Sequence, residues 1–236
     1  MSVQYPLFFI QRFKGKVLFN VPMSEHTSIR IGGPADVMAF PKDEGDLKDL
    51  ILFAEAKNFP FYVLGSGANL LVRDGGVRGI VVNMSEGFGE ILWQDDAKAV
   101  VGAGVKLAQL AAECGDRGFS GIEIAAGIPG TIGGAVTMNA GAYGGEMKDV
   151  VDGVEFIGKK AQKGFLTAPE INFQYRKTNL PRSTVVTRAH MRFSRKSPDE
   201  IKEKTKELRE IRAQGSSIGY PNAGSIFKNP PSGPAA

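Results

Sequence analysis

The most informative stretch of this chain is AAGIPGTIGGAVTMNAGAYGG, residues 125–145. It holds seven glycines and no basic residue, and it is mostly small and apolar, whereas ordinary loops are polar. Small residues let a backbone approach a flat or extended ligand closely, and buried amide groups there would need that ligand as their hydrogen-bond partner. The stretch therefore predicts a backbone cradle for a bound cofactor. The alternative is a tightly packed run of strand and turn that needs glycine for steric reasons alone.

A second glycine-rich turn, Gly65–Leu70 (GSGANL), follows a predicted strand. It is similar to the dinucleotide fingerprint GxGxxG, but Leu70 stands where the third glycine is needed. The next residues, Leu71–Gly76, read as strand and turn rather than as the helix that the fingerprint requires. Consecutive backbone amides in such a turn can still hold a phosphate. A simple connecting loop is the alternative.

A third segment of interest is Pro221–Pro230 (PNAGSIFKNP), a short turn bracketed by prolines. No GxSxG elbow surrounds Ser225, so a serine hydrolase is not indicated. Ser225 is instead a candidate proton donor, with Lys228 and Asn229 as candidate ligands for an anion or a polar group. A purely structural turn serine is the alternative.

The composition is that of an ordinary globular protein, with 42% hydrophobic and 23% charged residues among 236. The formal net charge of +4 suits anionic ligands, although a merely basic surface is the favoured interpretation. Basic residues do not gather into a tract with interleaved aromatics, so we expect no nucleic-acid partner. Cys114 is the only cysteine, which excludes a disulfide within the chain and a cysteine-rich zinc site. Its spacing predicts a buried structural thiol on a helix.

Neither a secretory leader nor a membrane segment is indicated by the sequence. The N-terminus lacks a basic leader with a long apolar run, and no window approaches the roughly 18 apolar residues of a membrane span. We therefore expect a cytoplasmic protein with no membrane partner. We also expect no bound metal. The oligomeric state is left open, with a monomer favoured.

Helices and strands are predicted to mix without regular alternation, which favours an α+β fold over a doubly wound sheet. Apolar spacing and capping residues predict helices over 43–58, 105–117 and 197–213. Strands are predicted over 61–64, 79–84, 97–101, 150–157 and 183–193. Residues 1–20 receive no role.

Six segments, taken together, resemble the UDP-N-acetylenolpyruvoylglucosamine reductase family (MurB). They occur in the family's order over nearly the whole chain from about residue 20, and the ordered set is highly specific. The segments are TSIRIGGPAD (27–36), LGSGANLLV (64–72), AGIPGTIGGA (126–135), MNAGAYG (138–144), YR (175–176) and AGSIFKNP (223–230).

The resemblance implies an α+β, two-subdomain FAD-binding fold of the vanillyl-alcohol-oxidase type. Residues 1–84 and 85–194 would form the two FAD-binding subdomains, and residues 195–236 would begin an α+β substrate-binding domain. It also implies non-covalent FAD held by Gly65, Ser66, Gly67, Ala68, Asn69, Leu70, Gly127, Pro129, Gly130, Thr131, Gly133, Gly134, Asn139, Gly141 and Ala142. The first six would hold the diphosphate, and the others would line the flavin and its ribityl chain.

The implied activity is that of a UDP-N-acetylmuramate dehydrogenase of peptidoglycan precursor synthesis, and thus of cell-wall biogenesis, cell shape and cell division. NADPH reduces FAD, and UDP-N-acetylglucosamine enolpyruvate is then reduced to UDP-N-acetylmuramate. Arg176 matches the family's arginine that stabilises the charge developing beside the substrate carboxylate, and Ser225 matches its proton donor. Tyr175, Lys228 and Asn229 match substrate contacts. For Arg176, the alternative is an exposed arginine at a strand end.

The chain departs from the family pattern at two places. Family members continue after the 223–230 turn with a segment that supplies a catalytic glutamate, and residues 1–236 offer no match to it. We therefore expect this chain to be a truncated form. The second departure is Gln214–Ser217, where many relatives have a proline after the glutamine, which puts local substrate-phosphate contacts in doubt.

Two other functions remain open on the sequence. One is another FAD-linked oxidoreductase of the same fold, in which FAD is attached through a histidine, with His26 and His190 as the only candidates. The other is a non-catalytic flavin-binding module.

Overall fold

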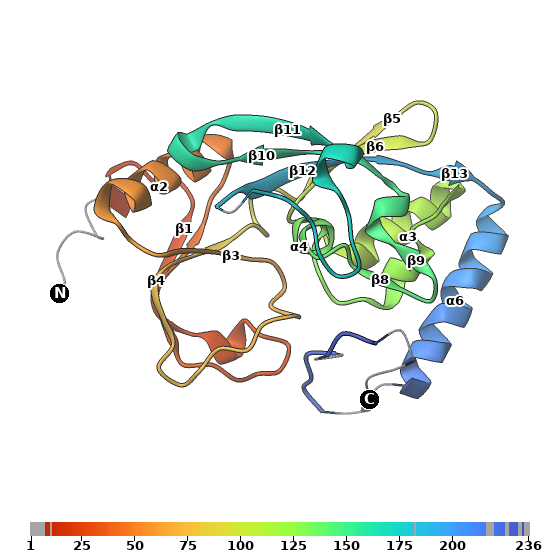
Figure 1. Ribbon diagram of the computed structural model, residues 1–236, viewed down its shortest axis with the longest axis horizontal. Coiled ribbons are helices and arrows are strands. Elements are labelled where there is room, and N and C mark those ends of the chain that lie inside the picture. The colour runs from red at the N-terminus through yellow and green to blue at the C-terminus, as the bar shows by residue number, and fades with distance from the viewer. Residues whose placement is uncertain are drawn as a thin grey trace.

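The computed structural model describes residues 8–9, 11–181, 183–215, 220–224, 227–230 and 233. The architecture is built on two separate sheets (Figure 1). The first sheet has four strands in the order β1-β2-β4-β3, in which β1 runs antiparallel to β2 while β2, β4 and β3 are parallel. Its strands are β1 (Lys16–Pro22), β2 (Pro34–Phe40), β3 (Phe61–Leu64) and β4 (Val77–Asn83).

Helix α2 (Glu44–Lys57) covers one face of this sheet. It begins at Asp43, whose carboxylate accepts the Asp46 N–H at 2.8 Å, a standard N-cap that satisfies one of the free amides of the first turn. It ends at Asn58, whose φ of 52° is the left-handed conformation common at helix C-termini. Leu47 and Leu50 on its inner side are fully buried. The predicted helix and its cap are thus confirmed.

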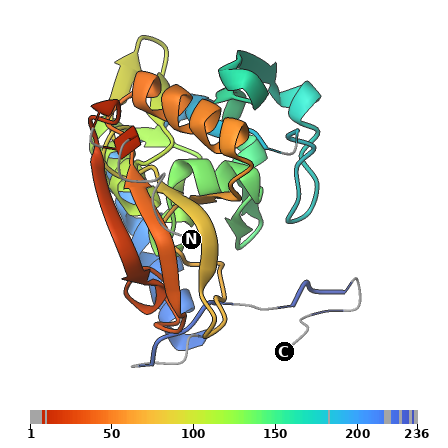
Figure 2. The ribbon, with the colours of Figure 1, turned by 90° about the vertical axis from the view of Figure 1, so that its left-hand side faces the viewer.

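The second sheet has five antiparallel strands in the order β11-β10-β12-β6-β5. Helices α3 (Leu107–Arg117) and α4 (Ile132–Thr137) share one hydrophobic cluster with its strands. The strands are β5 (Ile91–Gln94), β6 (Lys98–Gly102), β10 (Val151–Ile157), β11 (Lys163–Thr167) and β12 (Val185–Arg192). Figure 2, turned by 90°, shows α2 between the four-stranded sheet and the strands β10 and β11.

Short elements complete the fold. They are the 3-10 helices η1 (Met23–Glu25), η2 (Glu123–Gly127), η3 (Met147–Asp149) and η4 (Lys159–Ala161), helix α5 (Ala168–Ile171), and the strand pairs β7 (Phe119–Ser120) with β13 (Ser194–Arg195) and β8 (Gly141–Ala142) with β9 (Gly145–Glu146). Helix α6 (Pro198–Gly215) runs down the side of α3 and η2 (Figure 1). Among the described residues, no helix combines the length and apolar character needed to cross a membrane.

The predicted α+β class and the predicted helices agree with this arrangement, and the strands predicted over 61–64, 79–84, 97–101, 150–157 and 183–193 are present with ends shifted by up to two residues. Among the described residues, eight strands were not predicted: β1, β2, β5 and β11 of the two large sheets, and the two-residue strands β7, β8, β9 and β13. Residues 71–76 form a turn without the predicted strand. The glycine-rich stretch contains a helix, α4, which its composition did not suggest. The proposed subdomain boundary near residue 84 falls between the two sheets, although the division itself stays a prediction.

Cys114 is fully buried on the inner side of α3, as predicted. Burial, helped by the nearby carboxylates of Glu123 and Glu113, raises its pKa from 9.0 to about 12. Because the thiolate is the reactive species, we expect iodoacetamide at pH 8 to leave Cys114 unmodified in the folded protein. Intact-mass spectrometry should show full alkylation only after unfolding in guanidinium chloride. Rapid alkylation of the folded protein would contradict the buried environment.

Candidate functional site

The two glycine-rich segments meet between the two sheets. Gly65 lies just after β3, and Thr131 lies just before α4. A Cβ atom added to Gly65 would stand 2.5 Å from Oγ1 of Thr131, so a larger residue at position 65 would require the Thr131 side chain to move. The predicted diphosphate turn and the predicted flavin segment are therefore in direct contact, although they are far apart in the sequence.

The turn at Gly65–Leu70 is fixed by the segment after β1. Gly67 has a φ of +65°, and a Cβ atom there would lie 2.0 Å from the backbone oxygen of His26. The carbonyl of Gly67 accepts the N–H of Ser28 at 3.1 Å. Gly67 thus meets two requirements that only glycine satisfies without strain, a left-handed backbone and a close backbone approach.

Part of the glycine content of residues 125–145 serves packing within the protein. Three backbone hydrogen bonds of 2.9–3.1 Å join Gly130, Ile132 and Gly133 to the segment 103–107 ahead of α3. A Cβ atom on Gly133 would stand 2.9 Å from that of Ala103. The steric alternative therefore accounts for these glycines at least in part, and contact of the segment with FAD remains a prediction.

Asn139 has its side chain fully engaged inside the protein. It has no exposed surface. Its Nδ2 donates to Oε2 of Glu146 and to the carbonyl of Gln174, each at 3.0 Å, and its Oδ1 accepts the Lys148 N–H at 3.0 Å. Both amide hydrogens and the amide oxygen are used. A contact between Asn139 and FAD would therefore have to come from its backbone.

Tyr175 and Arg176 occupy the tip of a tight turn. Gln174 and Lys177 close it with two backbone hydrogen bonds of 2.9 and 3.1 Å. Arg176 has a φ of 55°, a left-handed conformation that is uncommon for residues other than glycine, asparagine and aspartate. Such a conformation costs on the order of 1–3 kcal/mol and is often found at functional sites. Twelve described residues other than glycine share a positive φ, so the contacts of Arg176 rather than its backbone conformation mark this turn as a candidate site.

The Arg176 guanidinium reaches back to the glycine-rich segment. Its Nη2 donates to the carbonyl of Gly141 at 2.5 Å, its Nη1 donates to the carbonyl of Asn139 at 3.5 Å, and Glu146 lies 3.9 Å away. Burial on its own raises the pKa of Glu146, but hydrogen bonds from Lys148 and Asn139 outweigh it, so the pKa lies below its ordinary value. The Glu146 carboxylate is therefore ionised beside Arg176. Arg176 therefore lies against the predicted cradle. Its guanidinium is anchored on Gly141 and Asn139, unlike that of an exposed arginine at a strand end.

The C-terminal turn lies against the same tip. The backbone N–H of Asn229 donates to the hydroxyl of Tyr175 at 3.4 Å, and the Tyr175 side chain is half exposed. Lys228 is exposed next to Asn229. Three predicted substrate residues are thus near one another. Ser225, the predicted proton donor, lies outside the described residues.

The two histidines lie apart from each other. Nε2 of His190 is 2.8 Å from Oε1 of Glu155, and its ring packs edge-on against Phe165 on β11. His26 lies at the end of η1, where its backbone oxygen approaches Gly67. Among the described residues, no group of three or more His, Cys, Asp or Glu could hold a metal ion.

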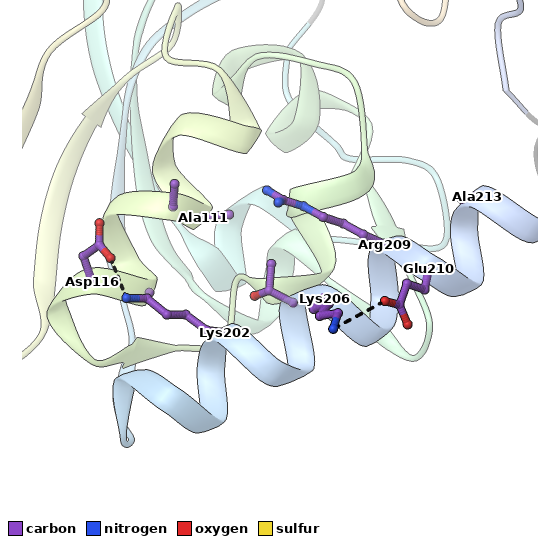
Figure 3. Close-up of a pocket in the computed structure, with 10 residues that line it drawn as sticks. Ala111, Asp116, Lys202, Lys206, Arg209, Glu210 and Ala213 are labelled. Atoms are coloured by element: carbon purple, nitrogen blue, oxygen red, sulfur yellow. Dashed lines mark ion pairs between the residues drawn. The ribbon is translucent and has the colours of Figure 1, made fainter. Parts of the chain in front are cut away.

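A pocket of about 570 Å³ lies between α3 and α6 (Figure 3). Small side chains such as Ala111 line one wall, and Lys202 at the other pairs with Asp116 at 3.1 Å. None of its lining residues is among those predicted for FAD or substrate. The volume of a pocket alone therefore does not locate the candidate cofactor site. That site is assigned from the two glycine-rich segments that meet between the sheets.

The residues present fit a dinucleotide cofactor such as FAD. Two loops with little side-chain bulk converge from separate sheets, and the Gly65 contact shows that a Cβ atom would fill the space between them. Small residues at such a junction leave backbone amides accessible to a diphosphate.

Comparisons with known proteins support the same assignment. Residues 35–161 match the family model described as FAD binding domain. A UDP-N-acetylenolpyruvoylglucosamine reductase of Caldanaerobacter subterraneus subsp. tengcongensis is 42% identical over 219 residues, 92% of this chain and 72% of the relative. The crystal structure of that reductase from Thermus caldophilus superposes with a TM-score of 0.79 at 33% identity, over 94% of this chain and 77% of the other.

A more distant structure shows how widely the fold is shared. The 6-hydroxy-D-nicotine oxidase of Arthrobacter nicotinovorans superposes with a TM-score of 0.63 at 17% identity, over 82% of this chain and 44% of that one. At this identity the similarity concerns the fold alone. Together the comparisons confirm the predicted FAD-binding fold of the vanillyl-alcohol-oxidase type and FAD as the cofactor.

Proposed function

Because the chain belongs to the UDP-N-acetylenolpyruvoylglucosamine reductase family, we propose that it reduces UDP-N-acetylglucosamine enolpyruvate to UDP-N-acetylmuramate with NADPH, in peptidoglycan precursor synthesis. The observation that carries this function is the position of Arg176. Its guanidinium is anchored on Gly141 at the edge of the glycine-rich segment, next to the half-exposed Tyr175. We place the protein in the cytoplasm, where NADPH and UDP-sugars are available, and favour a monomer.

FAD, when bound, supplies the two-electron chemistry that couples NADPH oxidation to reduction of the vinyl group. The turn Gly65–Leu70 would hold its diphosphate through backbone N–H groups. The segment Gly127–Ala142 would line the flavin and its ribityl chain. Binding is proposed to be non-covalent; of the two candidate histidines, His190 is engaged with Glu155 and Phe165.

Arg176 would bind the carboxylate of the enolpyruvyl group. Reduction of the vinyl group places negative charge on the carbon beside that carboxylate, and a fixed cation stabilises the charge as it develops. The planar guanidinium has five N–H donors and matches a carboxylate better than an ammonium does. Its bonds to Gly141 and Asn139 use part of this donor set and fix its orientation.

The remaining substrate roles stay proposals. Ser225 would donate the proton that completes the reduced carbon, and a neutral hydroxyl suffices because the acceptor is strongly basic. Lys228 and Asn229 would contact the substrate from the C-terminal turn. Support for their position comes from the hydrogen bond between Asn229 and the Tyr175 hydroxyl.

Anaerobic reduction tests the function in two steps. NADPH should bleach the 450 nm absorbance of the purified yellow protein, and adding the enolpyruvyl UDP-sugar should restore it while UDP-N-acetylmuramate forms. Bleaching without recovery would contradict reduction of the enolpyruvyl sugar by this chain and favour a flavin-binding module without that activity. A protein that holds no flavin would contradict the proposal, and FAD that stays attached after denaturation would favour a covalent oxidoreductase instead.

A further inference from the structure

One arginine joins the two sheets through a cluster of carboxylates. Nη1 of Arg188, on β12, lies 2.6 Å from Glu44 and 3.3 Å from Glu155, and its Nη2 lies 2.7 Å from Glu90. Glu155 belongs to β10 in the same sheet. Glu90 precedes β5, and its backbone oxygen accepts the Gly102 N–H at 2.8 Å, so it too belongs to the five-stranded sheet. Glu44 alone comes from the other side, from the first turn of α2.

Glu44 receives two cations from the five-stranded sheet, Arg188 and Lys163 of β11. Its side chain is only 17% exposed and that of Arg188 only 25%, so solvent screens their attraction less than it screens a surface pair. Burial on its own raises the pKa of Glu44, but the hydrogen bonds from Lys163 and Arg188 outweigh it and hold the pKa below its ordinary value. Glu44 is therefore ionised at neutral pH and fixed to both partners.

The junction between α2 and the five-stranded sheet also contains backbone hydrogen bonds and hydrophobic contacts. The Glu55 carboxylate, further along α2, accepts the backbone N–H of Lys160 at 3.0 and 3.1 Å. Ile157 and Val185, from the five-stranded sheet, share one hydrophobic cluster with Leu47 of α2. Helix α2 is thus one of the elements that attach the four-stranded sheet to the five-stranded sheet (Figures 1 and 2).

The proposed FAD site also spans this junction, with one glycine-rich turn from each side. A ligand that binds across two bodies pays the cost of ordering them unless they are already held in place. We infer that Glu44 is a positioning residue that fixes the two FAD-binding subdomains relative to each other and so increases the affinity for FAD. The inference rests on the FAD-binding part of the proposed function and is independent of its sugar substrate.

Glu90 provides the matched control. Glu90 accepts two hydrogen bonds from the Arg188 guanidinium, at 3.0 and 2.7 Å, whereas Glu44 accepts one, at 2.6 Å. Its removal takes at least as many bonds from Arg188, but all of them lie within one subdomain. A difference between the Glu44 and Glu90 variants therefore reports the link between the subdomains rather than the loss of an ion pair in general.

The test compares FAD binding to apoprotein prepared from wild type, Glu44→Gln, Glu90→Gln, Arg188→Gln and the Glu44→Gln/Arg188→Gln double variant, with the quenching of flavin fluorescence as readout. We expect Glu44→Gln to raise the FAD dissociation constant about 10-fold, within the usual range of coupling between sites, and Glu90→Gln to change it less than about 2-fold. The double variant should lose less than the product of the two single effects, because the residues act through one pair.

Circular dichroism and thermal unfolding of the apoproteins separate this effect from misfolding. Glu44→Asp keeps the charge on a shorter side chain and should bind FAD with an affinity between those of wild type and Glu44→Gln. If Glu44→Gln does not fold, Glu44→Asp replaces it in the comparison with Glu90→Gln. Equal FAD dissociation constants for folded Glu44→Gln and Glu90→Gln would overturn the inference while leaving the proposed function intact. A wild-type protein that binds no FAD would overturn both.

Discussion

Gly67→Ala is expected to abolish stable binding of FAD. A methyl group at this position would lie 2.0 Å from the backbone oxygen of His26, and the φ of +65° is unfavourable for alanine. The backbone strain alone costs on the order of 1–3 kcal/mol. The overlap with His26 must also move the turn, so the amides that would hold the diphosphate lose their arrangement. We expect the FAD dissociation constant to rise by about 100-fold or more, since each 1.4 kcal/mol is a factor of ten.

Gly75→Ala is the matched control for this variant. Gly75 lies in the turn ahead of β4, and a Cβ atom there meets no atom within 4 Å. The control should therefore bind FAD as the wild type does. The measurement is the ratio of absorbance at 450 and 280 nm after purification, followed by titration of the apoprotein with FAD and circular dichroism to verify folding. Wild-type affinity in folded Gly67→Ala would show that this turn does not hold the cofactor.

The helices could be predicted from the sequence because their ends carry local signals. Asp43 caps α2 through its own side chain, and the N–H of Ser197 donates to Glu200 at the start of α6, in the pattern expected from the sequence alone. Both signals act within four residues and do not depend on the rest of the fold. The helical spacing of buried residues such as Leu47 and Leu50 adds to them.

The strands that were missed lack such signals. In β2 (Pro34–Phe40) the last four residues are all buried, so the apolar and polar residues do not alternate. In β1 (Lys16–Pro22) only Val21 is buried, so the strand has no clear apolar face. Such strands are defined by their neighbours in the sheet rather than by their own pattern. Helix α4 was missed for a similar reason, because Gly133 and Gly134 disfavour a helix until packing against Ala103 compensates.

Some features of the candidate site could likewise be predicted from the sequence, and others could not. Glycine spacing located Gly65, Gly67 and the stretch 125–145, because glycine is required wherever backbones approach closely. The side-chain network around Asn139 could not be predicted, since its partner Gln174 lies 35 residues away in sequence. The role of Glu44 was also not predicted, since its partner Arg188 is 144 residues away.

Arg176→Lys should separate the two half-reactions of the proposed function. A lysine ammonium keeps the charge but cannot hold the Gly141 carbonyl and a substrate carboxylate with one planar group, as the guanidinium can. Because the charge on the substrate develops only in the second half-reaction, reduction of the flavin by NADPH should stay within about 3-fold of wild type. Reoxidation by the enolpyruvyl UDP-sugar should slow by about 100- to 1,000-fold, the usual effect of removing one group that stabilises a transition-state charge.

Stopped-flow absorbance at 450 nm measures both rates, and a titration of the oxidised flavin spectrum with the UDP-sugar measures substrate binding without turnover. Arg192→Lys is the matched control, because Arg192 also pairs with a carboxylate, that of Asp152 at 2.8 Å, but on the exposed side of the five-stranded sheet. It should leave both rates unchanged. If Arg176→Lys slows both half-reactions equally and weakens FAD binding, Arg176 acts through the conformation of the glycine-rich segment at Gly141 and not on the substrate. A selective loss of reoxidation together with weaker sugar binding follows only if its guanidinium faces the substrate carboxylate.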